Sequence, residues 1–184
     1  MGETRNAGSF RDPSGTVFIA ADGSILRSVN PVYRENYERF CSSGLRERLC
    51  RDGLLVPFRE ADELVELGSF KTLKAEKIEF VSYPYEWSFG QLKDAALLTL
   101  EIQKTALEHN MMLKDASAYN VQFRRGRPVF IDLLSFETAD DRPWSAYGQF
   151  CSHFLAPLAL LAPPMSDADF VRVYSKPRNL GFNT

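Results

Sequence analysis

Two runs of mainly apolar residues near the start of the chain predict a β-hairpin. The runs cover residues 16–20 and 24–29, and both are rich in β-branched residues. Between them, Asp22 and Gly23 supply the positive φ angles that a tight turn needs. We expect the ordered fold to begin with these two strands. Residues 1–15, rich in Gly, Ser, Asn and Pro, are expected to form a flexible N-terminal arm.

Apolar residues at helical spacing predict four helices. The stretches with this spacing are residues 30–44, 45–50, 88–110 and 144–161. The third is the strongest, because Ser88 and Gln91 have the spacing of a capping box and a wide apolar face follows them. We therefore expect one long core helix, with shorter helices before and after it.

Further strands are expected on both sides of the long helix. Residues 77–83 alternate like a strand, and residues 54–58 form a shorter extended run. After the helix, residues 121–123 and 128–131 flank a turn at Gly126, which predicts a second hairpin that ends at Asp132. With two hairpins among these helices, the expected fold class is α+β.

Composition narrows the possible functions. With 22 basic and 24 acidic residues the net charge is -2, so no global field favours nucleic acid or an anionic membrane. The three cysteines have no C-x-x-C spacing and only two histidines are present, which disfavours a zinc site and predicts reduced core thiols. The polar N-terminus predicts no secretory signal and a cytoplasmic protein. The longest apolar run, residues 154–162, is too short to cross a membrane.

The candidate chemistry lies between the long helix and the second hairpin. Asp115 and Asn120 have D-x-x-x-x-N spacing, and Asp132 follows at the end of an apolar strand. Phosphoryl transfer needs a carboxylate that orients the acceptor and oxygen ligands that hold Mg²⁺ on the phosphates. A simpler interpretation stays open, in which Asp115 and Asn120 are turn residues and all three are retained for structure.

In this order of elements the chain resembles the protein-kinase-like superfamily, including its aminoglycoside and choline kinase branches. The resemblance implies a truncated two-lobed fold, with a small β-rich lobe and hinge in residues 16–87 and a mainly helical part in residues 88–184. It implies Asp115 as catalytic base, Asn120 and Asp132 as metal ligands, Mg²⁺ with ATP or GTP as cofactors, and a small-molecule hydroxyl or amine as acceptor. Leu113 and the residues after Asp132 depart from the family pattern.

The nucleotide-binding part of that pattern is incomplete. The first hairpin has no glycine-rich loop, and Arg27 stands roughly where the family has a lysine. If Arg27 faces the cleft, it could bind phosphate and pair with Glu35 or Glu38 on the following helix. Otherwise it is an outward residue of the strand. Tyr83, in the expected hinge, could contact the nucleotide, or it could pack the hinge.

A second resemblance covers most of the chain. The runs that begin at Tyr83 and Phe130, together with Asp12-Pro-Ser-Gly, look like the N-terminal part of bacterial proteins described as SAM-dependent methyltransferases. The resemblance implies a downstream methyltransferase domain as partner, and SAM is not expected to bind within this chain. Three functions therefore stay open: an active phosphotransferase, an inert kinase-like module, and an accessory module that positions a substrate for methyl transfer.

Overall fold

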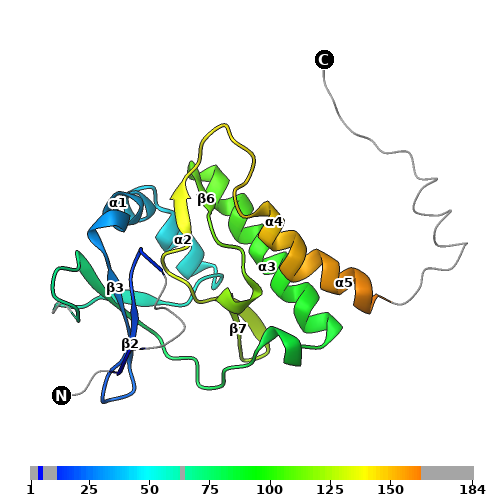
Figure 1. The fold of residues 1–184 in the computed structure, drawn as a ribbon, viewed down its shortest axis with the longest axis horizontal. Coiled ribbons are helices and arrows are strands. Elements are labelled where there is room, and N and C mark those ends of the chain that lie inside the picture. Colours follow the sequence, from blue (N-terminus) through cyan, green and yellow to red (C-terminus); the bar gives the residue numbers. More distant parts are fainter. Residues whose placement is uncertain (1–3, 6–11, 63–64, 163–184) are drawn as a thin grey trace, which may run out of the picture.

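An antiparallel sheet and a group of helices lie side by side in the computed structural model, which describes residues 4–5, 12–62 and 65–162 (Figure 1). The sheet has five strands in the order β1-β2-β3-β5-β4. These strands are β1 (Thr4–Arg5), β2 (Val17–Ile19), β3 (Ile25–Val29), β4 (Phe58–Glu60) and β5 (Lys71–Ala75). The predicted α+β class and first hairpin are confirmed, and Gly23 has the expected positive φ of 77° in the turn.

The strand predicted over residues 77–83 is wrong. The strand beside β3 is β5, which precedes residues 77–83 in the chain. Its other edge pairs with β4. Phe80 and Val81, whose alternation suggested a strand, are exposed. Backbone pairing with β3 and β4, not the apolar pattern, places β5 in the sheet.

The N-terminal arm behaves differently from the expectation where it is described. Residues 1–3 and 6–11 lie outside the described residues, as do residues 163–184, including the predicted turn-like C-terminal end. Thr4–Arg5 pairs with β2, and residues 12–15 form a tight turn against β3. Ser14 in this turn is buried, so residues 12–15 are part of the packed fold.

The four predicted helices are confirmed, the last of them from Tyr147 and not from Trp144, and one short helical turn over Pro84–Glu86 was not predicted. In chain order they are the 3₁₀ turn η2 (Pro31–Tyr33), α1 (Arg34–Ser42), α2 (Leu45–Arg51), the 3₁₀ turn η3 (Pro84–Glu86), α3 (Phe89–Glu108), α4 (Tyr147–Phe150), the π-helical turn η5 (Cys151–Leu155) and α5 (Ala156–Leu161). Ser88 caps α3 and forms the expected capping box with Gln91. The wide π turn ends two residues before Pro157, which cannot donate the backbone hydrogen bond of a regular helix.

Four short strands surround the loop that carries the candidate chemistry. The predicted hairpin consists of β7 (Val121–Arg124) and β8 (Arg127–Phe130), and the 3₁₀ turn η4 (Ala118–Asn120) leads into it. A second pair, β6 (Met111–Leu113) with β9 (Phe136–Thr138), was not predicted. These two pairs enclose residues 114–120 and 131–135.

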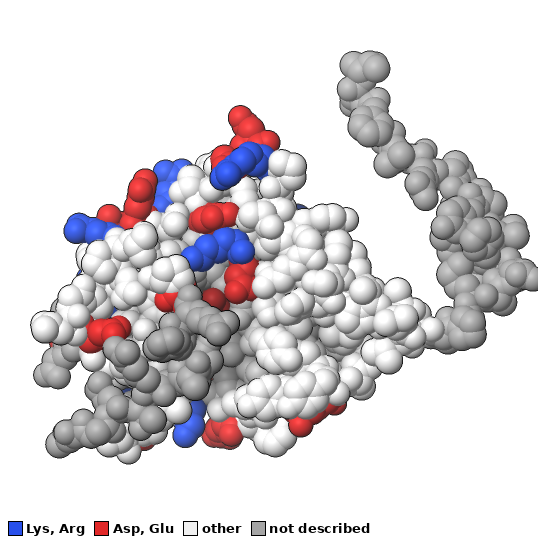
Figure 2. Space-filling view, viewed as in Figure 1, with Lys and Arg blue, Asp and Glu red and all other residues white. Residues whose placement is uncertain are grey.

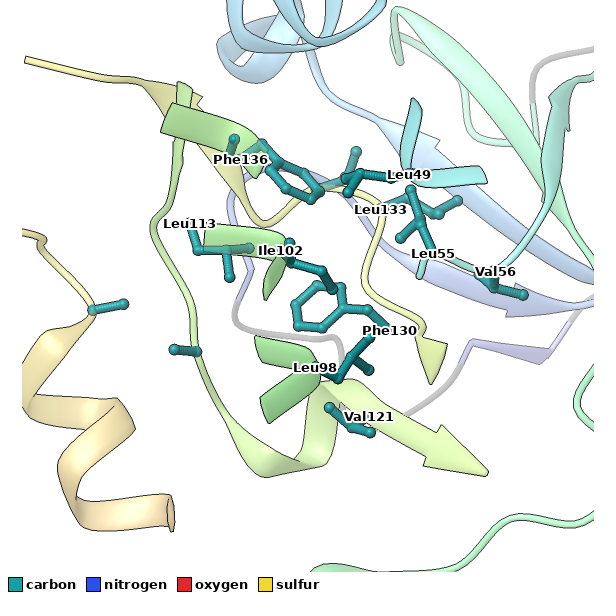
Figure 3. Close-up of a cluster of buried hydrophobic side chains, with 14 of the residues drawn as sticks. Leu49, Leu55, Val56, Leu98, Ile102, Leu113, Val121, Phe130, Leu133 and Phe136 are labelled. Atoms are coloured by element: carbon teal, nitrogen blue, oxygen red, sulfur yellow. The ribbon is translucent and has the colours of Figure 1, made fainter. Parts of the chain in front are cut away.

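One apolar core connects the sheet side to the helices (Figure 3). Ile102 and Leu98 of α3 face Phe130 of β8, while Leu49 of α2 lies beside Phe136 of β9. Phe40 of α1 stacks on Phe136 with ring centroids 4.6 Å apart. The three cysteines are free but only half-buried, so they are less deeply packed than expected. Within the described ranges, no helix is long and apolar enough to cross a membrane.

Candidate functional site

Two chain segments that carry the candidate residues are joined by backbone hydrogen bonds at both ends. The amide of Lys114 donates to the carbonyl of Ser135 at 2.8 Å, and the amide of Ile131 donates to the carbonyl of Asn120 at 2.8 Å. Residues 114–120 and 131–135 therefore run side by side. This pairing brings the backbone positions of Asp115, Asn120 and Asp132 into one region of the fold.

The helical part supports the loop from the other side. Gln149 accepts a hydrogen bond from the Ala116 amide at 2.7 Å, and Nδ1 of His153 accepts one from the Ala118 amide at 3.2 Å. The Trp144 indole donates to the carbonyl of Leu113 at 2.7 Å. The loop thus rests on side chains of residues 144–153, and these contacts could not be read from the spacing of Asp115 and Asn120.

The loop residues themselves show one ordinary turn contact and one anomaly. The carboxylate of Asp115 is half-buried and accepts a hydrogen bond from the Ser117 amide at 2.9 Å, as in an Asx turn. The side-chain nitrogen of Asn120 is buried and has no hydrogen-bond partner among the described residues. Buried polar groups are nearly always paired, so Asn120 is the residue of the loop whose environment is incomplete.

Asp132 sits at the point where the sheet meets the loop. Its carboxylate accepts hydrogen bonds from the Ser135 hydroxyl and from the Leu134 amide, the latter at 3.3 Å. Its Oδ1 lies 3.6 Å from Nη2 of Arg27, so strand β3 reaches this carboxylate. The side chain keeps 20% of its surface exposed, which leaves it accessible to a ligand.

Arg27 faces the site, and the alternative of an outward strand residue is wrong. It is 8% exposed, and its guanidinium forms an ion pair with Asp12 as well as lying near Asp132. Its Nε is buried, and no described residue is its hydrogen-bond partner. The expected pairing with Glu38 is also wrong: Glu38 is exposed and bonds Arg34 at 2.8 Å, because both lie one turn apart on the outer face of α1.

Sequence reasoning missed the second cation and the turn that contacts it. Nζ of Lys114 donates to the Ser14 hydroxyl at 2.7 Å and lies 4.5 Å from the centre of the Tyr33 ring. Ser14 and Asp12 both belong to residues 12–15, which we call the Asp12 turn. The signal available in the sequence was the Asp12-Pro-Ser-Gly run, but nothing in it indicated contact with a residue 100 positions away.

Tyr33 forms the buried floor of this region. Its hydroxyl donates to the Phe136 carbonyl at 2.6 Å and accepts from the Phe136 amide at 3.1 Å. Burial raises the pKa of the Tyr33 hydroxyl far above its ordinary value. The bond to the Phe136 carbonyl opposes this rise, and the carboxylates of Asp132 and Asp12 add to it. Tyr33 therefore stays neutral and acts as a structural group.

Tyr83 lies apart from these contacts. It is half-exposed and stacks on Tyr85 with ring centroids 5.5 Å apart, while its backbone amide is bound by Glu86. The structure therefore places Tyr83 in the segment between β5 and α3 without bringing it into contact with Arg27 or Asp132. Its predicted contact with a nucleotide stays a prediction.

Figure 2 shows basic and acidic side chains side by side near the middle of one face, between the sheet and the helices. The surface over α4 and α5 carries no charge, since residues 144–162 contain no Asp, Glu, Lys or Arg. The charged groups near the middle of this face therefore lie beside an uncharged surface.

A magnesium–nucleotide site in this region would have few protein ligands. No group of three or more His, Cys, Asp and Glu side chains in the described residues could hold a metal ion. Mg²⁺ on a nucleotide, however, needs only one or two protein oxygen ligands, because phosphates and waters supply the others. Asp132 and the amide oxygen of Asn120 would be those ligands, and the free Nε of Arg27 is a donor suited to phosphate.

Comparison with known proteins finds likenesses in sequence and in structure. No protein-family model matches the chain. It is 41% identical over 161 residues to the nodulation protein NoeA of Rhizobium meliloti (strain 1021), a match that covers 85% of this chain and 33% of that protein. The chain thus spans about a third of this relative's length. The solved structure of vaccinia related kinase 3 superposes with a TM-score of 0.49 and 12% identity, over 73% of this chain and 47% of that one.

Proposed function

We propose that the chain is a kinase-like module that binds a nucleoside triphosphate with Mg²⁺ between β3 and the paired segments 114–120 and 131–135. The observation that carries this proposal is the position of two unpaired polar atoms, Arg27 Nε and Asn120 Nδ2. Both belong to the site, and a buried polar atom without a partner indicates a place where a ligand or ordered water completes the bonding. Arg27 would bind phosphate, and Asp132 and Asn120 would hold Mg²⁺.

The order of the elements supports the same proposal. A hairpin bearing Arg27, a long helix, a loop with Asp115 and Asn120, a short hairpin and then Asp132 follow one another in the chain. This is the order that the kinase-like resemblance implies. Tyr83 would lie at the connection between the sheet and α3, near the nucleotide.

The activity that we assign to this site is phosphate transfer to a small-molecule hydroxyl or amine. The acceptor oxygen or nitrogen would attack the terminal phosphorus while Asp115 takes the acceptor's proton. The bond from that phosphorus to the bridging oxygen would break, and its electron pair would leave with the nucleoside diphosphate. Bound Mg²⁺ would neutralise charge on the phosphates.

Calorimetry with Mg-ATP tests the binding proposal. We expect weak binding that disappears when EDTA removes the metal, because a glycine-rich loop is absent and Arg27 is the main phosphate donor. Asp132→Asn should weaken Mg-ATP binding at least tenfold, whereas Asp141→Asn, at an exposed aspartate outside the site, should leave it unchanged. No heat at millimolar Mg-ATP in a folded sample would refute the proposal.

Phosphate release from ATP, with water as the acceptor, tests the transfer step. Asp115→Asn should abolish release while Mg-ATP still binds, because this carboxylate contacts the acceptor and not the metal. If the wild type releases no phosphate, the transfer step is refuted and only the proposal of Mg-ATP binding remains.

A non-catalytic module of a longer protein is the second candidate function. The specific observation in its favour is that a 41% identical relative matches only over a third of its own length. In this alternative the chain positions a substrate for another domain, such as a methyltransferase domain that follows it. SAM should then give no heat with this chain, and SAM binding here would contradict both candidate functions.

A further inference from the structure

Both cations of the candidate site are already bound by one short segment of the chain. Arg27 forms an ion pair with the carboxylate of Asp12, and Lys114 donates a 2.7 Å hydrogen bond to the hydroxyl of Ser14. Asp12 and Ser14 both lie in the Asp12 turn. Oxygen atoms of this turn therefore contact Arg27, which lies beside Asp132, and Lys114, which begins the paired segment 114–120.

The Asp12 turn is held in place by its own hydrogen bonds. The Ser14 amide donates to the carboxylate of Asp12 at 2.8 Å, and Asn30 bonds the carbonyls of Pro13 and Ser14 at 2.9 and 2.8 Å. Gly15 packs so closely on β3 that an added Cβ would lie 1.9 Å from the Ser28 carbonyl oxygen. The contacts with Arg27 and Lys114 are thus made by an ordered turn.

A carboxylate on a guanidinium resembles a phosphate oxygen on the same group. Both are anionic acceptors, and both form charge-assisted hydrogen bonds with arginine. Asp12, however, satisfies only part of the guanidinium, because Nε of Arg27 is still buried without a partner. A phosphate group offers more oxygen atoms and could engage this remaining donor.

We propose that the Asp12 turn is an internal phosphate mimic, which occupies an anion subsite made by Arg27 and Lys114 and must leave both cations before a polyphosphate can bind there. The inference rests on the proposed function for the identity of the polyphosphate as a nucleotide. Nothing in the sequence pattern assigned Lys114, Ser14 or Asp12 to this site. A polyphosphate binds only those molecules in which the turn has moved away from the two cations. Because these molecules are a small fraction of the total, the apparent dissociation constant of the polyphosphate is higher than its intrinsic value.

Removing one charge from the turn tests the mimic. Asp12→Asn keeps the side-chain oxygen that caps the Ser14 amide, but it removes the anion from Arg27. We expect this variant to bind inorganic tripolyphosphate at least tenfold more tightly than wild type in low-salt calorimetry. Asp141→Asn, with the same loss of charge at an exposed position, should bind as wild type does. Adding Arg27→Gln to Asp12→Asn should abolish the gain.

Two probes separate this inference from the proposed function. Tripolyphosphate reports on the anion subsite, and Mg-ATP reports on the nucleotide site. A gain for tripolyphosphate without any Mg-ATP binding would support the mimic and refute the nucleotide. Wild-type binding of Mg-ATP with no gain for either probe in Asp12→Asn would support the nucleotide and refute the mimic.

Two further outcomes overturn the mimic outright. One is a folded Asp12→Asn protein that binds tripolyphosphate no better than wild type, including the case in which neither binds it. The other concerns Ser14→Ala, which is the test variant if Asp12→Asn fails to fold. Because Ser14→Ala releases Lys114 alone, it should raise the affinity for tripolyphosphate severalfold. A Ser14→Ala protein without this gain would exclude the proposal.

Discussion

Gly15 allows the sharpest test of how the Asp12 turn is attached to the sheet. In Gly15→Ala, the new Cβ would lie 1.9 Å from the Ser28 carbonyl oxygen and 2.8 Å from its carbonyl carbon, where real Cβ contacts are essentially never closer than 3.0 Å. Both obstacles are backbone atoms of the central region of β3, so no side-chain rotation can relieve them. The turn must retreat from the strand by about 1 Å or more.

The cost follows from the hydrogen bonds that this retreat disrupts. Thr16 donates to the Ser28 hydroxyl at 2.9 Å, Ser28 donates back to the Thr16 carbonyl at 2.9 Å, and Asn30 donates to the Ser14 carbonyl at 2.8 Å. A net hydrogen bond contributes about 1 kcal/mol. Loss of two or three of them predicts that Gly15→Ala lowers the free energy of unfolding by about 2–3 kcal/mol.

Urea denaturation of wild type, Gly15→Ala and Gly148→Ala measures this effect. Gly148 is the matched control, because it lies in α4 with no atom within 4 Å of an added Cβ. Gly148→Ala should be neutral or stabilising by up to about 1 kcal/mol. Gly15→Ala should also bind tripolyphosphate more tightly, since the displaced turn releases Arg27. Unchanged stability of Gly15→Ala would refute the close packing of the turn on β3.

Three further predictions concern the supports of the site. Ser88→Ala removes the capping box of α3 and should lower the free energy of unfolding by about 1 kcal/mol, measured by thermal denaturation against the control Ser152→Ala at an exposed serine of η5. Gln103→Leu should cost about 1–3 kcal/mol in urea, because it leaves the buried Leu113 amide without its 2.8 Å acceptor. Phe130→Ala should cost about 3–5 kcal/mol, since this ring is fully buried between α3 and β9. Costs below about 0.5 kcal/mol would contradict the respective contacts.

The elements that the sequence predicted correctly are those whose signals lie within a few neighbouring residues. The turn at Asp22 and Gly23, the capping box at Ser88 and the helical spacing after it all act within a few residues, and each was found where expected. Strand β5 could not be predicted in this way, because only Thr72 and Leu73 of its five residues are buried. Its position depends on pairing with β3, which lies more than 40 residues earlier.

In the candidate site, too, the residues related by short spacing were predicted and the long-range contacts were not. Spacing indicated that Asp115, Asn120 and Asp132 belong together, and backbone bonding does place their segments side by side. The kinase-like resemblance suggested Glu35 or Glu38 as a partner of Arg27, whereas the carboxylates that approach its guanidinium are those of Asp12 and Asp132. Contacts across such separations leave no periodic trace in a single sequence. Their prediction would need the tertiary fold.

The double hydrogen bond between Tyr33 and Phe136 has a consequence for the order of folding. It joins residues 103 positions apart, and the bond from Lys114 to Ser14 spans 100 positions. A ribosome-bound chain must therefore expose residue 136 before its first strands can complete their buried bonding. Long loops must close before these contacts form, which slows folding of such topologies. Nascent chains that end before β9 should stay sensitive to protease, and protection should appear abruptly once Phe136 has left the exit tunnel.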